Sequence, residues 1–230
     1  MTSFRIVAVV ALVVVVGLTA GSLISLADQP ATSAATKMAG LPKPKTDGGM
    51  PLMEALKKRQ TSRQFADRKL PDQVLSNMLW AACGVNREDG KRTAPTAVNC
   101  QEIDVYVAKA DGLWLFDAKA NDLKLVLDKD IRALTGKQEF VKDAAVNLIF
   151  VADFAKMGGP MAKSMTEADK VLYSAADTGF VSQNVYLFCA SEGLATVFRG
   201  AVDQQKLNRA LRLESEQFVA FAQTVGYPPS

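Results

Sequence analysis

The run TEADKVLYSAADTGFVSQNVYLFCASEG, residues 166–193, decides the fold. Thr166 and Asp169 have the spacing of a capping box, and the closing glycine is a residue type that commonly ends helices. Between positions 171 and 190 the only charged side chain is Asp177. A helix that is apolar on nearly every side is normally buried. We therefore predict one long, buried, central helix.

Apolar patterns on both sides of this helix predict a sheet. The continuous apolar run Ala145–Ala152 predicts a central strand that is buried on both faces. Strands and helices follow one another irregularly, which favours the α+β class: a mostly antiparallel mixed sheet with helices packed on it. The other predicted strands are Ile103–Lys109, Gly112–Asp117, Asp122–Asp128, Leu194–Val202 and Phe218–Val225, and the other predicted helices are Leu52–Lys58, Asp72–Cys83, Asp130–Thr135, Gln138–Asp143 and Gln204–Leu213.

The first 49 residues differ in composition from the rest of the chain. A basic residue precedes an apolar run, and Ser25-Leu26-Ala27 forms a small-x-small cleavage pattern, so we predict a signal peptide over residues 1–27 and export. An uncleaved membrane anchor is the alternative, since the run is about long enough to span a bilayer. Residues 28–49 are rich in Pro, Thr, Ala, Gly and Lys and predict a flexible linker. Residues 50–230 are then one folded domain.

The composition excludes several classes of function. The chain contains no histidine, which excludes Ser-His-Asp and Cys-His catalysis and zinc hydrolysis by an HExxH motif. The formal net charge is +3, and the basic residues are scattered among acidic ones without a basic stripe, so we predict no nucleic-acid partner. We predict neither a metal site nor a catalytic side chain. If the protein is an enzyme, an organic cofactor carries the chemistry.

The chain has three cysteines. Cys189 falls on the predicted buried helix, so we expect its thiol to be free. Cys83 and Cys100 could form a disulfide in an oxidising compartment, and the sequence leaves this pairing open.

Two polar stretches are candidate binding sites. Arg59 and Arg63 are four residues apart with hydroxyl side chains between them, and such a group can close on one phosphate. A solvated cationic surface is the alternative. Further along, a Pro-containing loop of small residues precedes a predicted strand. Its Asn99 and Gln101 offer donors and acceptors suited to the edge of a heterocycle, although an ordinary helix-to-strand loop would look similar.

Four motifs in order resemble those of the nitroreductase-like flavoprotein family, in particular the branch that includes thiazoline and oxazoline dehydrogenases. The resemblance extends over about Met50–Pro228. The motifs are Arg59-x-Thr61-x-Arg63, Ala94-Pro95-Thr96-Ala97-x-Asn99-x-Gln101, Asn184-x-x-Leu187 followed by Gly193-Leu194, and Gly226-Tyr227-Pro228.

The resemblance implies FMN bound at a homodimer interface, with two-electron transfer through flavin N5. The motif positions also assign roles to individual residues. Arg59, Gln60, Thr61 and Arg63 would hold the phosphate and ribityl end, Pro95, Thr96 and Asn99 would line the isoalloxazine, and Gly200, after Arg199, would present a backbone N–H near N5. No GxGxxG motif for a dinucleotide occurs, so we expect FMN and not FAD.

This chain departs from the family pattern in three respects. Thr61 stands where members usually have Ser, which preserves the hydroxyl. The sequence ends at Ser230, without the basic tail of many members, so we expect FMN to be held less tightly. Most members are cytosolic. For an exported member, the identity of the reductant is an open question.

We therefore expect an exported FMN-dependent oxidoreductase that acts on a small conjugated substrate such as a nitroaromatic or a quinone. We expect the flavin and the backbone to do the chemistry, with solvent, Tyr173 or Tyr186 as the proton source. The alternatives are a flavin-binding or degenerate scaffold without turnover and an interaction domain without a cofactor.

Overall fold

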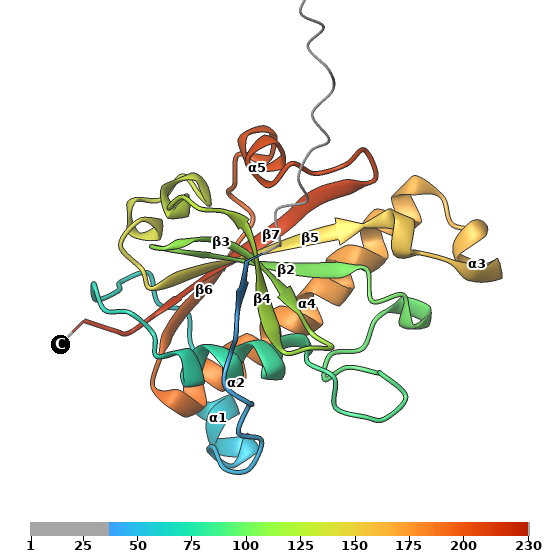
Figure 1. Cartoon of the computed structure of the whole chain (residues 1–230). Coiled ribbons are helices and arrows are strands. Elements are labelled where there is room, and N and C mark those ends of the chain that lie inside the picture. The colour runs from blue at the N-terminus through green and yellow to red at the C-terminus, as the bar shows by residue number, and fades with distance from the viewer. Residues whose placement is uncertain (1–36, 230) are drawn as a thin grey trace, which may run out of the picture. The chain divides into compact units, whose positions relative to one another are not determined.

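A seven-stranded sheet forms the centre of the computed structural model, which describes residues 37–229 (Figure 1). Its strands are β1 (Met38–Ala39), β2 (Ile103–Lys109), β3 (Gly112–Asp117), β4 (Asp122–Leu127), β5 (Val146–Asp153), β6 (Ala195–Arg199) and β7 (Gln217–Gly226). They lie in the order β1-β4-β3-β2-β5-β7-β6, and each neighbouring pair is antiparallel. The α+β class and the antiparallel sheet are confirmed. The described strands form no parallel pair, so the sheet is not mixed.

Every residue of β5 is buried, as its apolar run predicts. Successive side chains of a strand point to opposite faces, so one strand supplies two cores. Leu148 and Phe150 belong to the larger core, whereas Ile149 and Val151 belong to a second core on the other face. The sheet is therefore covered on both sides in this region.

Helices lie on both faces of the sheet, with α1, α2 and α4 on one side and α5 on the other (Figure 1). The helices are α1 (Leu52–Lys58), α2 (Asp72–Cys83), the short α3 (Gly159–Lys163), α4 (Glu167–Glu192) and α5 (Gln204–Leu211). Where two further short helices were expected, the chain forms single 3₁₀ turns. These turns are Arg132–Leu134 and Glu139–Val141, and two more are Ala97–Asn99 and Phe154–Lys156.

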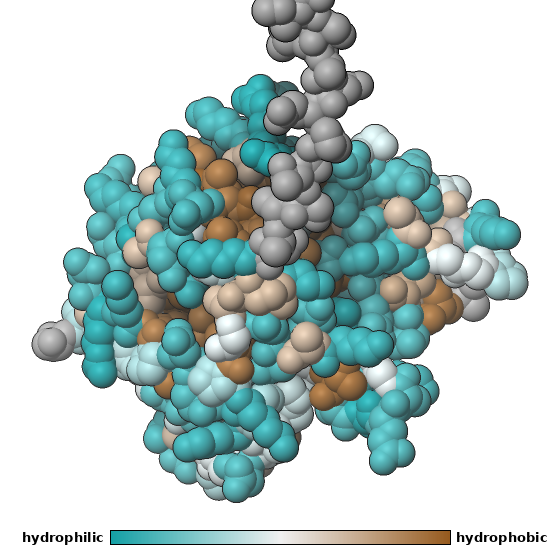
Figure 2. Space-filling view, in the orientation of Figure 1, coloured by the Kyte–Doolittle hydropathy of each residue, from teal (hydrophilic) through white to brown (hydrophobic). Residues whose placement is uncertain are grey.

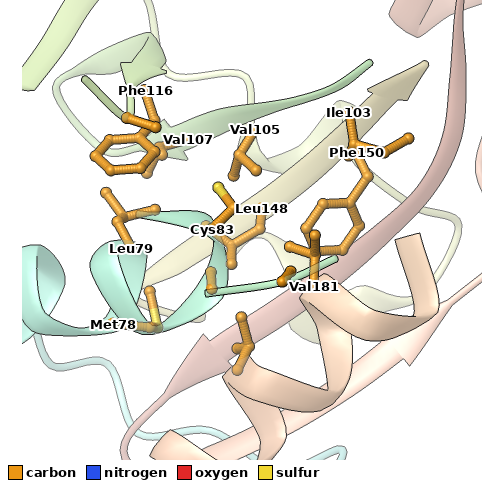
Figure 3. Close-up of a cluster of buried hydrophobic side chains, with 14 of the residues drawn as sticks. Met78, Leu79, Cys83, Ile103, Val105, Val107, Phe116, Leu148, Phe150 and Val181 are labelled. Carbon is orange, nitrogen blue, oxygen red and sulfur yellow. The ribbon is translucent and has the colours of Figure 1, made fainter. Parts of the chain in front are cut away.

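The larger core lies between the sheet and the helices α2 and α4. Figure 3 shows Leu79 of α2 and Val181 of α4 directed toward Leu148 and Phe150 of β5. All four side chains are almost completely excluded from solvent. This packing fixes α4 against the sheet, and α4 in turn supports the segments described below.

Helix α4 begins and ends where the sequence predicts. The Thr166 hydroxyl accepts a hydrogen bond from the Asp169 N–H at 3.2 Å, and the Asp169 carboxylate accepts one from the Thr166 N–H at 2.9 Å. This is the predicted capping box, which satisfies backbone donors that the helix cannot satisfy itself. Gly193 follows the last turn with φ 66°, the left-handed conformation that glycine adopts without strain.

The expectation that α4 is buried on nearly every side is wrong for one face. Leu172, Ala176 and Phe180 are exposed and recur every four residues, so they form one continuous apolar line, called here the α4 stripe. Leu172 exposes 66% of its surface and Phe180 48%. The opposite face, with Val181 and Val185, is buried. An apolar composition alone does not reveal whether a face is covered by the same chain.

Residues 37–49, which the sequence places in the linker, pack against the domain. Ala39 of β1 pairs with Leu123 of β4. Further along, the Lys45 N–H donates to the Asn77 side chain at 2.8 Å, and the Met50 N–H donates to the Ser191 hydroxyl at 2.7 Å. The predicted signal peptide and the rest of the linker lie outside the described residues. No helix within residues 37–229 has the length and hydrophobicity needed to cross a membrane.

All three cysteine thiols are free. Cys83 and Cys189 are buried, and burial raises the pKa of the Cys83 thiol to about 11 and also raises that of Cys189. The prediction for Cys189 is confirmed, and the open question for Cys83 and Cys100 is answered: they do not form a disulfide.

Candidate functional site

The segment Arg59–Arg63, called here the cationic segment, leaves the end of α1 and lies against α4 and β6. The Ser62 N–H donates to the Thr196 carbonyl of β6 at 2.9 Å. The Thr61 hydroxyl lies 3.0 Å from the hydroxyl of Tyr186 on α4 and forms a hydrogen bond with it. The segment is therefore fixed at two successive residues.

Tyr186 joins three parts of the chain at this place. Its hydroxyl accepts a hydrogen bond from the Phe198 N–H of β6 at 2.9 Å while it also bonds Thr61. The guanidinium of Arg59 lies over the Tyr186 ring, 5.3 Å from its centroid, which is a cation–π contact. Sequence motifs identify Arg59 and Thr61 as site residues, whereas the sequence suggests Tyr186 only as a proton source.

The arginines of the cationic segment carry positive charge without internal compensation. Among the described residues, neither Arg59 nor Arg63 has a carboxylate within ion-pair distance. Arg63 and Thr61 are exposed, and Arg59 is half-buried. The nearby Lys58 is instead paired with Glu54 at 2.9 Å. Unpaired guanidinium groups beside an exposed hydroxyl suit an anion such as a phosphate.

A cavity of about 430 Å³ opens beside the cationic segment. Gln60, Lys57 and Tyr186 line it together with Thr196 of β6 and Pro228 near the end of the chain. Gln60 is thus a predicted site residue that lines this cavity, whereas Arg59, Thr61 and Arg63 are not part of its lining.

The second predicted group lies on the loop between α2 and β2. Residues 96–101, called here the site loop, contain three non-glycine residues with positive φ: Val98 at 44°, Asn99 at 56° and Gln101 at 53°. Such conformations cost on the order of 1–3 kcal/mol each and persist where the surroundings hold them. Pro95, directly before this loop, and Asn99 within it are exposed, so both side chains face outward.

Hydrogen bonds within and below the site loop hold this strained conformation. The Thr96 hydroxyl accepts from the Gln101 N–H at 2.9 Å, and the Gln101 amide donates to the Asn99 side chain at 3.3 Å. The Ala97 N–H donates to the carboxylate of Asp177 on α4 at 2.8 Å. Asp177, the lone charge in the middle of α4, is therefore a structural anchor that sequence motifs did not assign.

Arg199 does not present its side chain to the surface. It is only 4% exposed, and its guanidinium donates to the Thr224 hydroxyl at 2.9 Å, the Thr135 carbonyl at 2.8 Å and the Asn147 side chain at 3.2 Å. Burial lowers the pKa of this guanidinium to about 10. The predicted contribution of Arg199 to a cofactor site is thus limited to its backbone, and Gly200 after it is exposed.

The predicted site residues form two groups along α4. The cationic segment is attached at Tyr186 and at Thr196 of β6, whereas the site loop is attached at Asp177. These two helix positions are roughly 13 Å apart at 1.5 Å per residue. The described residues hold no group of three or more His, Cys, Asp or Glu side chains that could bind a metal ion.

Comparison with known proteins identifies the chain as an oxidoreductase of the α+β class. It belongs to the Nitroreductase family, because the model of that family matches residues 56–227. The match contains the cationic segment, the site loop and all of α4. The resemblance to the nitroreductase family is therefore confirmed, whereas the particular branch stays a prediction.

Individual relatives agree with this assignment. A protein of Methanocaldococcus jannaschii named as a putative nitroreductase is 29% identical over 174 residues, which are 71% of this chain and 85% of that protein. A crystal structure with the same description, from Ralstonia eutropha JMP134, has a TM-score of 0.78 and 38% identity and covers 88% of this chain and 94% of that one. The fold is also shared with an NADPH:FMN oxidoreductase of Vibrio harveyi, solved with NAD⁺, at a TM-score of 0.57 and 18% identity over 78% and 69% of the two chains.

Proposed function

We propose that this chain is an FMN-dependent oxidoreductase that works as a homodimer and transfers two electrons to or from a small conjugated substrate, such as a nitroaromatic or a quinone. One observation carries the proposal. Arg59 and Arg63 flank a fixed Thr61 hydroxyl and have no carboxylate partner among the described residues. In a protein of the Nitroreductase family, this unpaired positive charge is suited to an anionic ligand.

The cationic segment suits the single terminal phosphate of FMN. Guanidinium groups form strong charge-assisted bonds with a phosphate, and the Thr61 hydroxyl can add a further bond because Tyr186 already fixes its position. FAD would instead need a glycine-rich turn for its pyrophosphate, and the sequence contains no GxGxxG motif. The name of the Vibrio harveyi protein, which includes FMN, supports the same choice.

A flavin ring has different requirements, which the site loop meets. Its neutral heterocyclic edge needs amide donors and acceptors, and Asn99 is exposed on a loop that internal hydrogen bonds hold in place. Pro95 and Thr96 would lie beside the ring, and the backbone at Gly200 would approach its centre. When bound, FMN supplies two-electron transfer through N5. The chain's own residues bind and orient it.

The two groups of site residues lie apart on α4, and we propose that a second copy of the chain completes the site. The α4 stripe supports this proposal, since Leu172, Ala176 and Phe180 are exposed on the same helix that holds both groups. Soluble proteins rarely leave such a continuous apolar line uncovered. The face of the molecule in Figure 2 is mainly hydrophilic, with hydrophobic residues confined to smaller areas.

We further propose that the protein is exported after cleavage near Ala27. The basis is the apolar run followed by Ser25-Leu26-Ala27. Electron donors differ between compartments, so the reductant of an exported enzyme need not be a nicotinamide. Intact-mass analysis of the protein, as its natural host produces it, tests the cleavage. A chain beginning near Asp28 is expected, and retention of Met1 in the membrane fraction would contradict it.

The cofactor is tested on the purified full-length protein. We expect a yellow protein that, after denaturation, releases a flavin that co-chromatographs with FMN. The colour should bleach with a reductant and return when a nitroaromatic or a quinone is added. Release of FAD, or no flavin binding after reconstitution at low salt, would overturn the FMN proposal. A bound flavin whose colour never returns with an acceptor would identify a scaffold without turnover.

A further inference from the structure

Three buried polar side chains lie together between the start of β2 and α4, directly behind the site loop. They are Glu102, Asp177 and Ser174, with exposed fractions of 0%, 3% and 0%. The Ser174 hydroxyl and the Asp177 carboxylate lie close to Glu102, but no hydrogen bond of good geometry reaches the Glu102 carboxylate oxygens or the Ser174 hydroxyl within the described structure. A buried carboxylate without donors is costly in its charged form. This cluster therefore requires an explanation that packing does not provide.

The protonation of Glu102 provides one. Burial, together with the nearby Asp177 carboxylate, raises the pKa of Glu102 to about 7, while Ser174 acts in the opposite direction. The other titratable group that faces the pair is the Cys100 thiol of the site loop, whose pKa is raised by burial and, in addition, by both carboxylates. Within residues 37–229, neither carboxylate has a Lys or Arg partner. One proton on the pair removes the repulsion.

Asp177 connects this pair to the site loop. Its carboxylate accepts the Ala97 N–H at 2.8 Å, which is the loop's bond to the long helix. The next residues, Val98 and Asn99, have positive φ angles that the chain would not adopt unaided. Any change that separates Asp177 from Ala97 therefore also releases the backbone that carries Asn99.

We propose that Glu102 and Asp177 are positioning residues that hold one proton between them and thereby fix the site loop in its strained conformation. With Glu102 neutral, Asp177 stays in place as the acceptor for the Ala97 N–H. Loss of the shared proton leaves two negative charges in one buried site, and the loop separates from α4 as the charges move apart. Separation of the loop would also move Thr96 and Asn99. The effect of this movement on a bound cofactor rests on the proposed function.

Hydrogen exchange at the Ala97 amide tests the proposal on the full-length protein without added cofactor. Between about pH 4.5 and about pH 7, the protection factor of this amide should fall by up to about tenfold per pH unit, because the opened loop leaves Glu102 with its ordinary, lower pKa, and it should level off above about pH 7. In Glu102→Gln, a neutral amide replaces the neutral acid, so protection should not change with pH. In Asp177→Ala, which removes the acceptor, protection should be low at every pH.

Asp104→Asn is the matched control, because Asp104 lies on β2, two residues after Glu102, but pairs with Lys156. It should keep the pH dependence of the wild type. A wild-type protection factor that stays constant over this range would overturn the proposal, as would an unchanged pH dependence in Glu102→Gln.

A parallel FMN titration separates this inference from the proposed function. If the exchange depends on pH but no flavin binds, the acid pair stands and the FMN proposal fails. If FMN binds but the exchange does not depend on pH, the FMN proposal stands and the acid pair fails.

Discussion

At the scale of single residues, the structure changes the role of Tyr186 from a possible proton source to a support. Its hydroxyl bonds both Thr61 and the Phe198 N–H, and its ring lies under Arg59. A hydroxyl engaged in this way orients its neighbours. The sequence could not show this, because the contacts join residues more than a hundred positions apart as well as residues on a neighbouring strand.

The predicted phosphate-binding and ring-binding parts of the flavin site should contribute differently to the affinity for FMN. Arg63→Ala removes a charged donor for the phosphate, worth about 1.5–3 kcal/mol, whereas Asn99→Ala removes neutral bonds worth about 1 kcal/mol each. Titration of apoprotein with FMN should thus show roughly tenfold or greater weakening for Arg63→Ala and a smaller effect for Asn99→Ala. Lys69→Ala, an exposed cation outside the cationic segment, is the control. The reverse order would show that the two assignments are wrong.

The buried Glu102 should also make stability depend on pH. Its pKa is raised from an ordinary value of 4.5 to about 7, so the folded state binds the proton more tightly than the unfolded state. The free energy of unfolding should therefore decline as pH rises between these two values, and the loss should be complete above about pH 7. Urea unfolding should be measured at about pH 5 and about pH 8. The free energy of unfolding of Glu102→Gln, relative to that of the wild type, should be higher at about pH 8 than at about pH 5. An equal difference at both pH values would contradict this.

At the scale of elements, local patterns predicted most of the fold. The bounds of α2 and β2 agree with the sequence-based ranges because their periodicity and end signals lie within the segments themselves. The two-residue strand β1 was not predicted, since it exists only through its pairing with β4. Strand β6 is shorter than expected because pairing with β7 ends at Arg199.

The candidate site shows the same difference between features set by local sequence and features set by contacts in the folded chain. Local motifs identified the cationic segment and the site loop, both of which the structure holds against α4. The anchor at Asp177 and the burial of the Arg199 side chain were not predicted, because both depend on which residues meet in the folded chain. The exposed α4 stripe was missed for a related reason: an apolar residue looks the same in sequence whether its own chain or a second copy covers it.

At the scale of the whole molecule, the α4 stripe predicts the oligomeric state. Phe180→Asp places a charge at one end of the stripe and should convert a two-chain particle into single chains, with loss of FMN affinity. Leu134→Asp is the matched control, because Leu134 is an exposed apolar residue outside the stripe. Light scattering measures the mass directly. A one-chain mass for the flavin-bound wild type would contradict both the homodimer and the shared site.

The two ends of the sheet carry a further consequence. Backbone groups at a sheet edge can recruit strands from other molecules, which leads to aggregation. Here Met38–Ala39 pairs with β4 at one end, and Ser62 donates to the Thr196 carbonyl of β6 at the other. The segment that carries the predicted phosphate ligands thus also shields an edge from polymerisation, so selection for solubility and selection for cofactor binding act on the same few residues.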